Sequence, residues 1–335
     1  MGIKKADGSY ASEKNREIAE QKEAELNKKI ETEAKKKESA VTFFASEPIY
    51  TIDSIILSDS CREELQTVIN SKRNWDKVFI LWGLGTVMKQ NKGLFINLYG
   101  APGTGKSMSA HAIAYSLEKK IICVNYADIE SKYVGETSKN LTKLFEYAKE
   151  NDYIIFFDEA DALLSKRVTN MSSSTDVSVN QTRSVLLTLL NDYSGMVIFA
   201  TNFISNYDAA FMRRIQFHVK FELPNEEMRK KLWEMYIPDQ MPAEINIDKI
   251  AHDHDDLSGS DISTAVLKAA LRAANENNDV IPHSYFEEAV TSIIASKNEN
   301  KGISDDDTVI EKRVVSEEYV NQQLGKNKEN EKEIV

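Results

Sequence analysis

The stretch GLFINLYGAPGTGKS, residues 93–107, decides the fold of this 335-residue chain. An apolar run that leads into the pattern G-x-x-x-x-G-K-S is typical of a buried strand, a glycine-rich loop and the start of a helix. Such a loop folds backbone N–H groups around phosphate, and the helix N-terminus adds a partial positive charge. The pattern therefore predicts a phosphate loop over Gly100–Ser107. Lys106 is expected to reach the terminal phosphates, and the Ser107 hydroxyl to ligate Mg²⁺.

Apolar runs and amphipathic helical patterns alternate on both sides of this loop. Alternation of this kind predicts a parallel sheet whose two faces are covered by helices. We therefore expect an α/β mononucleotide-binding domain, with the P-loop NTPase parallel sheet, over residues 46–223. Strands are expected at 93–100, 120–126, 153–160, 195–201 and 218–223, and helices at about 58–72, 107–119 and 139–150.

Beyond Pro224 the strand signals end and helical patterns take over. Residues 224–297 are therefore predicted to form a small all-helical lid domain. Its four helices are expected within 226–237, 245–253, 258–277 and 283–296.

Three polar stretches lie outside these patterns. Residues 1–45 include a Glu-, Lys- and Ala-rich run at 12–39 that favours helix. Its few apolar positions fit either a short coiled coil or partner-docking helix, or a solvated, fraying helix. Residues 298–335 are predicted to be a largely disordered tail. The Ser/Thr-rich stretch at 169–182 is predicted to be a loop.

Composition excludes several classes of function. The net charge of −11 argues against bulk attraction to nucleic acid or anionic membranes. No apolar run has the length of a membrane helix, so a cytoplasmic protein is expected. The two cysteines make no metal-binding spacing, and Cys123 is expected to be a buried thiol. Trp75 and Trp82 are expected to be core or packing residues.

A second chemical site follows the run YIIFF at 153–157. Asp158 ends a buried parallel strand, which places its carboxylate beside the phosphate loop as a Mg²⁺ partner. Glu159 would then polarise the water that attacks the terminal phosphate. For Asp161, a solvated acidic position is a reasonable alternative.

Together these motifs resemble the AAA ATPases of the classic clade, and the resemblance covers about 250 residues. It implies that Asn202, at the end of VIFATN, is the polar sensor that helps to orient the attacking water. It also implies that Arg213 and Arg214, in DAAFMRRI, are paired arginine fingers that reach a neighbouring subunit. An Arg there would neutralise charge that develops in the transition state. The functional unit is then a homo-oligomeric ring, expected to be a hexamer.

The same resemblance extends to a pore loop and a lid. Lys132, Tyr133 and Val134, in SKYVGETSKNL, match the first pore loop of members that thread a polypeptide; an ordinary loop tyrosine is the alternative for Tyr133. Gly259 and Ser260 match the nucleotide-contacting lid, with Ser260 where Ala is commoner. The expected nucleotide-binding positions are Asp53, Gly100, Pro102, Gly103, Thr104, Gly105, Lys106, Ser107, Met108, Asp158, Gly259 and Ser260.

The leading hypothesis is thus an ATP- and Mg²⁺-dependent ring motor that remodels, unfolds or disassembles a protein client by pore-loop threading. An ATP-switched ring scaffold without threading is the alternative, and the acidic charge disfavours a nucleic-acid helicase or clamp loader. A narrower similarity, in LLTLLNDYSGMVIFATN and NYDAAFMRRIQFHVKFELP, is to single-ring bacterial AAA proteins, some of which are encoded with contractile injection systems.

Overall fold

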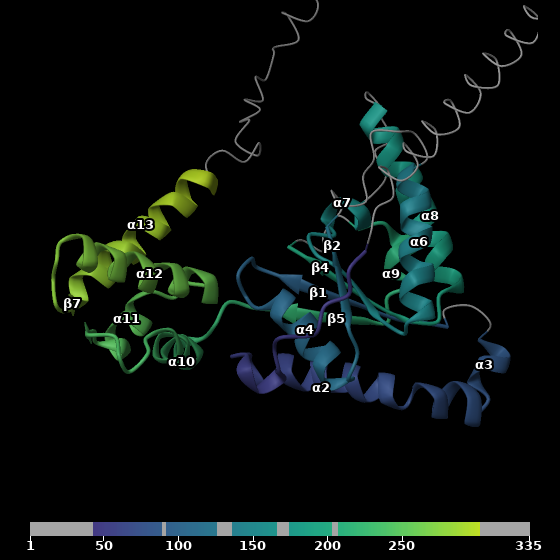
Figure 1. Cartoon of the computed structure of the whole chain (residues 1–335), viewed down its shortest axis with the longest axis horizontal. Coiled ribbons are helices and arrows are strands. Elements are labelled where there is room, and N and C mark those ends of the chain that lie inside the picture. The colour runs from purple at the N-terminus through teal and green to yellow at the C-terminus, as the bar shows by residue number, and fades with distance from the viewer. Residues whose placement is uncertain (1–42, 89–91, 126–135, 166–173, 203–206, 302–335) are drawn as a thin grey trace, which may run out of the picture.

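The computed structural model describes residues 43–88, 92–125, 136–165, 174–202 and 207–301. A five-stranded sheet and the helices that cover it account for the first part of this range, and a group of helices stands beside them (Figure 1). The predicted α/β fold class with a helical C-terminal part is confirmed.

All neighbouring strands of the central sheet are parallel, in the order β2-β3-β4-β1-β5. Since parallel strands end at the same edge of a sheet, side chains that follow them are brought together there. The strands are β1 (Leu94–Gly100), β2 (Ile121–Val124), β3 (Ile154–Phe157), β4 (Met196–Thr201) and β5 (Phe217–Phe221).

One face of the sheet packs against α6 (Glu136–Glu150) and α8 (Ser174–Asp192). Phe157 and Phe199, on adjacent strands, stack with ring centroids 5.4 Å apart. Phe145 of α6 covers Phe157 at 6.4 Å, and all three side chains are buried. This apolar layer fixes the strand ends that carry the site.

The opposite face packs against α2 (Asp59–Arg73) and α4 (Lys106–Ser116). Leu65 of α2, Ile96 of β1 and Ile113 of α4 are fully buried in this layer. Burial on both faces explains why the strands read as continuous apolar runs instead of alternating ones.

Short helical segments connect these layers. They are the 3₁₀ turn η1 (Ile52–Ser54), the π-helical segment η2 (Lys77–Leu81), α3 (Leu84–Val87), α7 (Asp161–Leu164) and α9 (Ala209–Met212). None of the helices over the described residues combines the length and apolar character that a bilayer-spanning segment needs.

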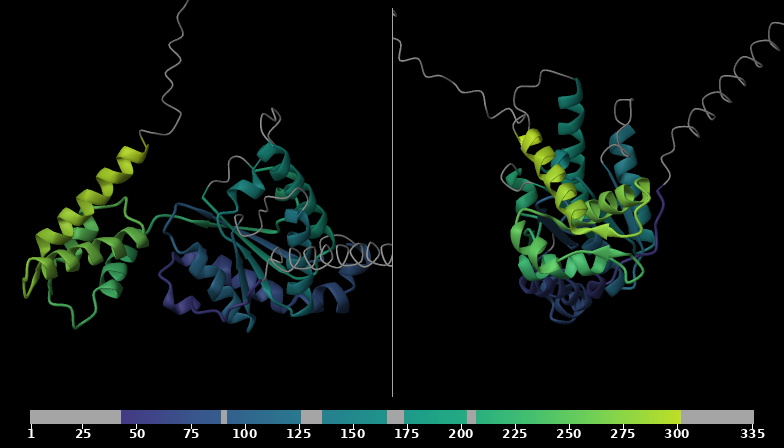
Figure 2. Two further views of the ribbon diagram at one scale, coloured as in Figure 1. Left: turned by 45° about the horizontal axis from the view of Figure 1, so that its top comes forward. Right: turned by 90° about the vertical axis from the view of Figure 1, so that its left-hand side faces the viewer.

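The helical part has a core of its own. Trp233 and Phe286 meet edge to face at its centre, with ring centroids 6.1 Å apart, and both are fully buried. Figure 2 shows this group beside the sheet and not on either of its faces. It comprises α10 (Glu226–Tyr236), α11 (Ile247–Asp253), α12 (Gly259–Asn275) and α13 (His283–Lys301), with the two-residue parallel strands β6 (Ala243–Glu244) and β7 (Ile281–Pro282). The expectation of no strand beyond Pro224 is therefore wrong.

The predicted loop at 169–182 is also wrong for its second half, because α8 begins at Ser174. Thr182, Leu186 and Leu190 of α8 are buried at helical spacing against the sheet. Burial of this face stabilises the helix despite the weak helix propensity of Ser, Thr and Val.

Trp82 is 68% exposed and is therefore not a core residue. It follows the π-helical segment η2, and Nζ of Lys77 lies over its indole ring, 5.4 Å from the ring centroid. Trp75 does pack inward: it stacks on Phe79 at 4.3 Å and donates its indole N–H to the Lys92 carbonyl at 3.1 Å.

Cys123 is exposed, which corrects the expected buried thiol. It lies on β2, an edge strand whose outer side is only partly covered, with Sγ 3.5 Å from Nε2 of His111. Cys61 is the buried cysteine, and its burial raises its thiol pKa to about 12.

Candidate nucleotide and magnesium site

The phosphate loop turns tightly between β1 and α4 because of its glycines. Gly100 and Gly103 have φ values of 142° and 73°, which non-glycine residues rarely adopt. A Cβ on Gly100 would lie 1.9 Å from the Phe221 carbonyl oxygen of β5. The close approach of loop and strand therefore requires glycine.

Lys106 begins α4 and points back into the loop. Its ammonium donates to the carbonyl oxygens of Gly100 at 2.7 Å and Ala101 at 2.8 Å, and to Oδ1 of Asn202 at 3.0 Å. Burial lowers the pKa of Lys106, and the nearby Asp158 and Asp161 carboxylates oppose that shift. The result is a cation fixed at the mouth of the loop, where phosphate oxygens would be bound.

Ser107 and Asp158 meet directly across the sheet edge. The Ser107 hydroxyl donates to Oδ2 of Asp158 at 2.8 Å. A hydroxyl and a carboxylate beside a phosphate site are the oxygen ligands that Mg²⁺ takes in such sites. These two residues therefore fit a magnesium ion.

Glu159 follows Asp158 in a strained conformation. Its φ is +50°, a region that costs a non-glycine residue on the order of 1–3 kcal/mol. Its N–H donates to Oδ1 of Asp158 at 3.0 Å, and the residue itself is exposed. The bond ties the position of Glu159 to the residue that fits the metal, and Glu159 is one of the residues that line the cavity.

Asn202 follows β4 and is held by Asp161. The Asn202 N–H donates to the two carboxylate oxygens of Asp161 at 3.3 and 3.2 Å. Asp161 is thus a structural acceptor and not a solvated acidic position, which corrects the alternative weighed for it. The available signal in the sequence was the position of Asp161, which comes shortly after Asp158 and Glu159 at the end of the same strand.

Arg213 and Arg214 are adjacent but have different surroundings. Arg214 donates from Nε to Oδ1 of Asn191 at 2.8 Å and from a terminal nitrogen to the Ala210 carbonyl at 2.7 Å. Arg213 is exposed, and its guanidinium makes no hydrogen bond or ion pair with the residues that the structure describes. The two arginines are therefore not equivalent.

A cavity of about 590 Å³ joins the phosphate loop to the helical part. This volume lies within the range of about 300–1,000 Å³ that ligand pockets occupy. Its apolar end is formed by the segment 55–57 and by α10, which the sequence did not single out. The amphipathic pattern of α10, whose Trp233 faces inward, was the available signal. The α10 residues that line the cavity are Met228, Leu232, Met235 and Tyr236.

Most of the predicted nucleotide-binding positions line this cavity, but Asp53 and Gly100 do not. Asp53 does not line it: its side chain is 98% exposed, 3.5 Å from Arg62, and Ser54 is the first lining residue of that segment. Gly100 lies behind the loop as an acceptor for Lys106. The positions that do line the cavity are Pro102, Gly103, Thr104, Gly105, Lys106, Ser107, Met108, Asp158, Gly259 and Ser260, together with Glu159 and Asn202.

The helical part reaches the loop through the first turn of α12. The Ser260 N–H donates to the Gly103 carbonyl at 3.3 Å. A Cβ on Gly103 would lie 2.2 Å from Oγ of Ser260 and 2.6 Å from Oγ of Ser258. The loop and this turn are therefore packed with no space for an added methyl group. The predicted pore-loop residues Lys132, Tyr133 and Val134 lie outside the described residues.

Residues 96–223 match the family described as "ATPase family associated with various cellular activities (AAA)". The chain carries an AAA domain. AAA domains are ATPase domains that use ATP with Mg²⁺, and the Lys106, Ser107 and Asp158 contacts of this AAA domain fit both.

The names of several curated proteins that are similar to this chain refer to proteasomes. It is 32% identical to the proteasome-activating nucleotidase of Methanopyrus kandleri over 213 residues, which are 61% of this chain and 49% of that protein. It is 31% identical to the 26S proteasome regulatory subunit 4 homolog of Schizosaccharomyces pombe, over 63% of this chain and 49% of that protein. For the 26S proteasome regulatory subunit 8 homolog B of Arabidopsis thaliana the identity is 31%, over 75% of this chain and 61% of the relative. The chain thus spans about half to three fifths of the length of these relatives.

Proposed function

We propose that this chain is a Mg²⁺-dependent ATPase that assembles into a homo-oligomeric ring and remodels a protein client. The observation that carries the proposal is the network at the sheet edge, in which Ser107 bonds Asp158 and Lys106 bonds Asn202. It joins the residues proposed to bind ATP and Mg²⁺ to Asn202, which is proposed to orient the attacking water.

In this proposal, each polar residue of the edge has one task. Lys106 binds the terminal phosphates, and Ser107 and Asp158 hold the metal. Magnesium supplies neutralisation of the phosphate charge. Glu159 accepts the proton of the attacking water, and Asn202, held by Asp161, orients that water.

Arg213 and Arg214, expected to be paired arginine fingers, have different roles in this proposal. Arg213, exposed at the end of α9, is the group that reaches a neighbouring subunit's nucleotide. Arg214 keeps that end in place through Asn191 and the Ala210 carbonyl. A site completed by another subunit requires a closed ring, for which a hexamer is our proposal.

The proposed client is a polypeptide. The relatives' names refer to proteasome regulation, which makes a polypeptide the substrate class that we propose. Lys132, Tyr133 and Val134 would grip the chain in the pore, and a scaffold without threading is the alternative. We also propose a cytoplasmic location and a likeness to single-ring bacterial AAA proteins, some of which are encoded with contractile injection systems. The proposed domain bounds are 1–45, 46–223, 224–297 and 298–335.

Tyr133→Ala separates threading from scaffold action. A threading ring should keep its ATPase rate and lose the ability to unfold a tagged, folded client, whereas a scaffold should keep both. Tyr115→Ala, on an exposed position of α4, is the matched control. A client recovered with Glu159→Gln in ATP, and not with Glu159→Gln plus Tyr133→Ala, would supply the substrate for this assay.

A further inference from the structure

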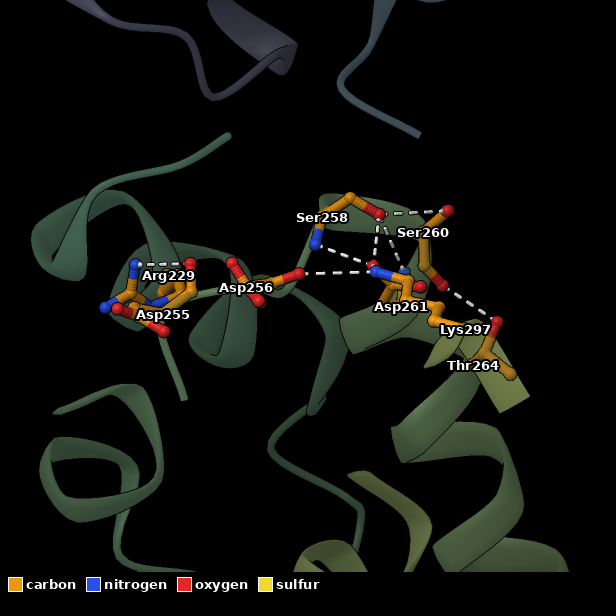
Figure 3. A network of polar contacts seen from close by, with 8 residues as sticks. All are labelled: Arg229, Asp255, Asp256, Ser258, Ser260, Asp261, Thr264 and Lys297. Carbon is orange, nitrogen blue, oxygen red and sulfur yellow. Dashed lines mark hydrogen bonds and ion pairs between the residues drawn. The ribbon is translucent and has the colours of Figure 1, made fainter. Parts of the chain in front are cut away.

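Lys297 joins the far end of α13 to the first turn of α12. Its ammonium donates to Oδ2 of Asp261 at 2.5 Å and to the Asp256 carbonyl at 3.2 Å (Figure 3). The Asp261 side chain is only 12% exposed, so this ion pair is partly shielded from solvent. One lysine therefore holds both the loop that precedes α12 and the carboxylate that caps it.

Three donors converge on the same carboxylate oxygen of Asp261. Besides Lys297, the N–H and the hydroxyl of Ser258 donate to Oδ2 at 2.7 and 2.6 Å. Ser258 and Asp261 form the capping box of α12, and Ser258 is 2% exposed. The Lys297 charge balances that of the carboxylate, and Lys297 and Ser258 together hold this oxygen in the capped turn.

That capped turn is the part of α12 that touches the phosphate loop. Ser260 donates to the Gly103 carbonyl at 3.3 Å, and a Cβ on Gly259 would lie 3.4 Å from the same oxygen. Gly259, Ser260 and Ser263 line the cavity, whereas Lys297 does not. A small rotation of the turn would change the shape of the cavity at the loop.

A second link between α12 and α13 lies away from the loop. Lys268 approaches the Ser292 hydroxyl at 3.5 Å, two turns beyond Asp261, and is exposed. It offers a matched control, because it joins the same two helices without reaching the capped turn.

We propose that Lys297 is a positioning residue for nucleotide binding: through Asp261 it fixes the first turn of α12 against Gly103 and thereby sets the affinity of the cavity for ATP. The proposal rests on the ATPase function proposed above. Lys297 contacts neither the phosphate loop nor the sheet edge that carries Glu159 in the described structure, so it acts on binding and not on the chemical step.

The test compares Lys297→Met, Lys297→Arg and Lys268→Met by steady-state ATPase kinetics and by binding of a fluorescent ATP analogue. Lys297→Met should raise KM and Kd about fivefold and leave kcat within about twofold, as expected for loss of a partly shielded ion pair. Lys297→Arg should restore wild-type values, and Lys268→Met should change neither constant. Lys297→Gln replaces the Met variant if the latter does not fold.

A double-mutant cycle with Asp261→Asn identifies the route. If Lys297 acts through Asp261, Lys297→Met should add less than a twofold change in Kd to the Asn variant. Wild-type Kd in Lys297→Met, an equal rise in Lys268→Met, or a fall in kcat without a rise in KM would each overturn the proposal. A wild-type chain that neither binds nor hydrolyses ATP would instead contradict the proposed function itself.

Discussion

The sheet edge and the helical part enclose the same cavity, but they contribute to it in different ways. At the edge, β1, β3 and β4 bring Lys106, Asp158 and Asn202 into a network whose hydrogen bonds reach across 51 and 96 residues of sequence. The helical part contributes an apolar wall and one capped helix turn, joined to the loop by the Ser260–Gly103 hydrogen bond.

This difference separates chemistry from binding. Residues of the edge are fixed by strands buried on both faces, as preorganised catalytic groups require. The helical part has a separate core around Trp233 and Phe286, so it can shift as a unit against the edge. Changes at Glu159 and Asn202 should therefore alter kcat, changes in the helical part should alter KM, and Lys106, which is proposed to contact the phosphates, should affect ATP binding.

Substitution of Arg213 should have the largest effect on kcat, whereas substitution of the adjacent Arg214 should affect stability. Arg213→Ala should lower kcat on the order of 1,000-fold, because the transition-state charge loses its partner from the next subunit. Arg214→Ala should instead lower the free energy of unfolding by about 1–2 kcal/mol, because its hydrogen bonds to Asn191 and Ala210 are lost. ATPase assays and denaturant unfolding of both variants measure this split.

An experiment that mixes two kinds of variant subunit provides the control for the Arg213 prediction. Arg213→Ala subunits mixed with Lys106→Met subunits should recover part of the ATPase rate, since each defect would lie on a different side of the shared interface. No recovery at any mixing ratio, with ring assembly intact, would contradict action between subunits.

Lys106→Met tests the contribution of the phosphate loop to ATP binding. Loss of the buried ammonium should weaken ATP binding on the order of 100-fold, because charge-assisted contacts to the phosphates disappear. Isothermal titration with ATP measures the change, and Lys149→Met, on the exposed end of α6, is the control. Unchanged affinity in Lys106→Met would show that the nucleotide binds elsewhere.

Ser260→Ala should give the smallest effect. The backbone N–H that bonds Gly103 is retained and only the hydroxyl, 3.3 Å from that of Ser258, is removed. We expect KM for ATP to change less than about threefold and kcat to stay constant. A large loss of kcat would break the division between edge and helical part.

Much of the sheet edge was predictable because its chemistry is local in the sequence. The strand–loop–helix pattern around Lys106 and the acidic pair after the run at 153–157 each specify a place in a parallel sheet. The partner of Asn202 was not predictable, since Asp161 and Asn202 are 41 residues apart and meet only when β3 and β4 pair.

The helical part was predictable as helices but not as a wall of the site. The amphipathic pattern of α10 indicates that Trp233 faces inward, but it does not indicate that Met228 and Leu232 line the cavity beside the phosphate loop. Likewise, the start of α8 at Ser174 depends on burial of Leu186 and Leu190 against the sheet, which overrides local composition. Tertiary packing supplied the information that the local pattern lacked.

Glu159→Gln tests the central claim most directly, with Glu150→Gln on the exposed end of α6 as the control. ATP affinity and hydrolysis are measured on the same preparation. We predict a Kd for ATP within about twofold of wild type and a turnover lowered about 100- to 1,000-fold, because the proton acceptor for the attacking water is lost. Hydrolysis at the wild-type rate would contradict the assignment of Glu159, and with it the mechanism proposed for the sheet edge.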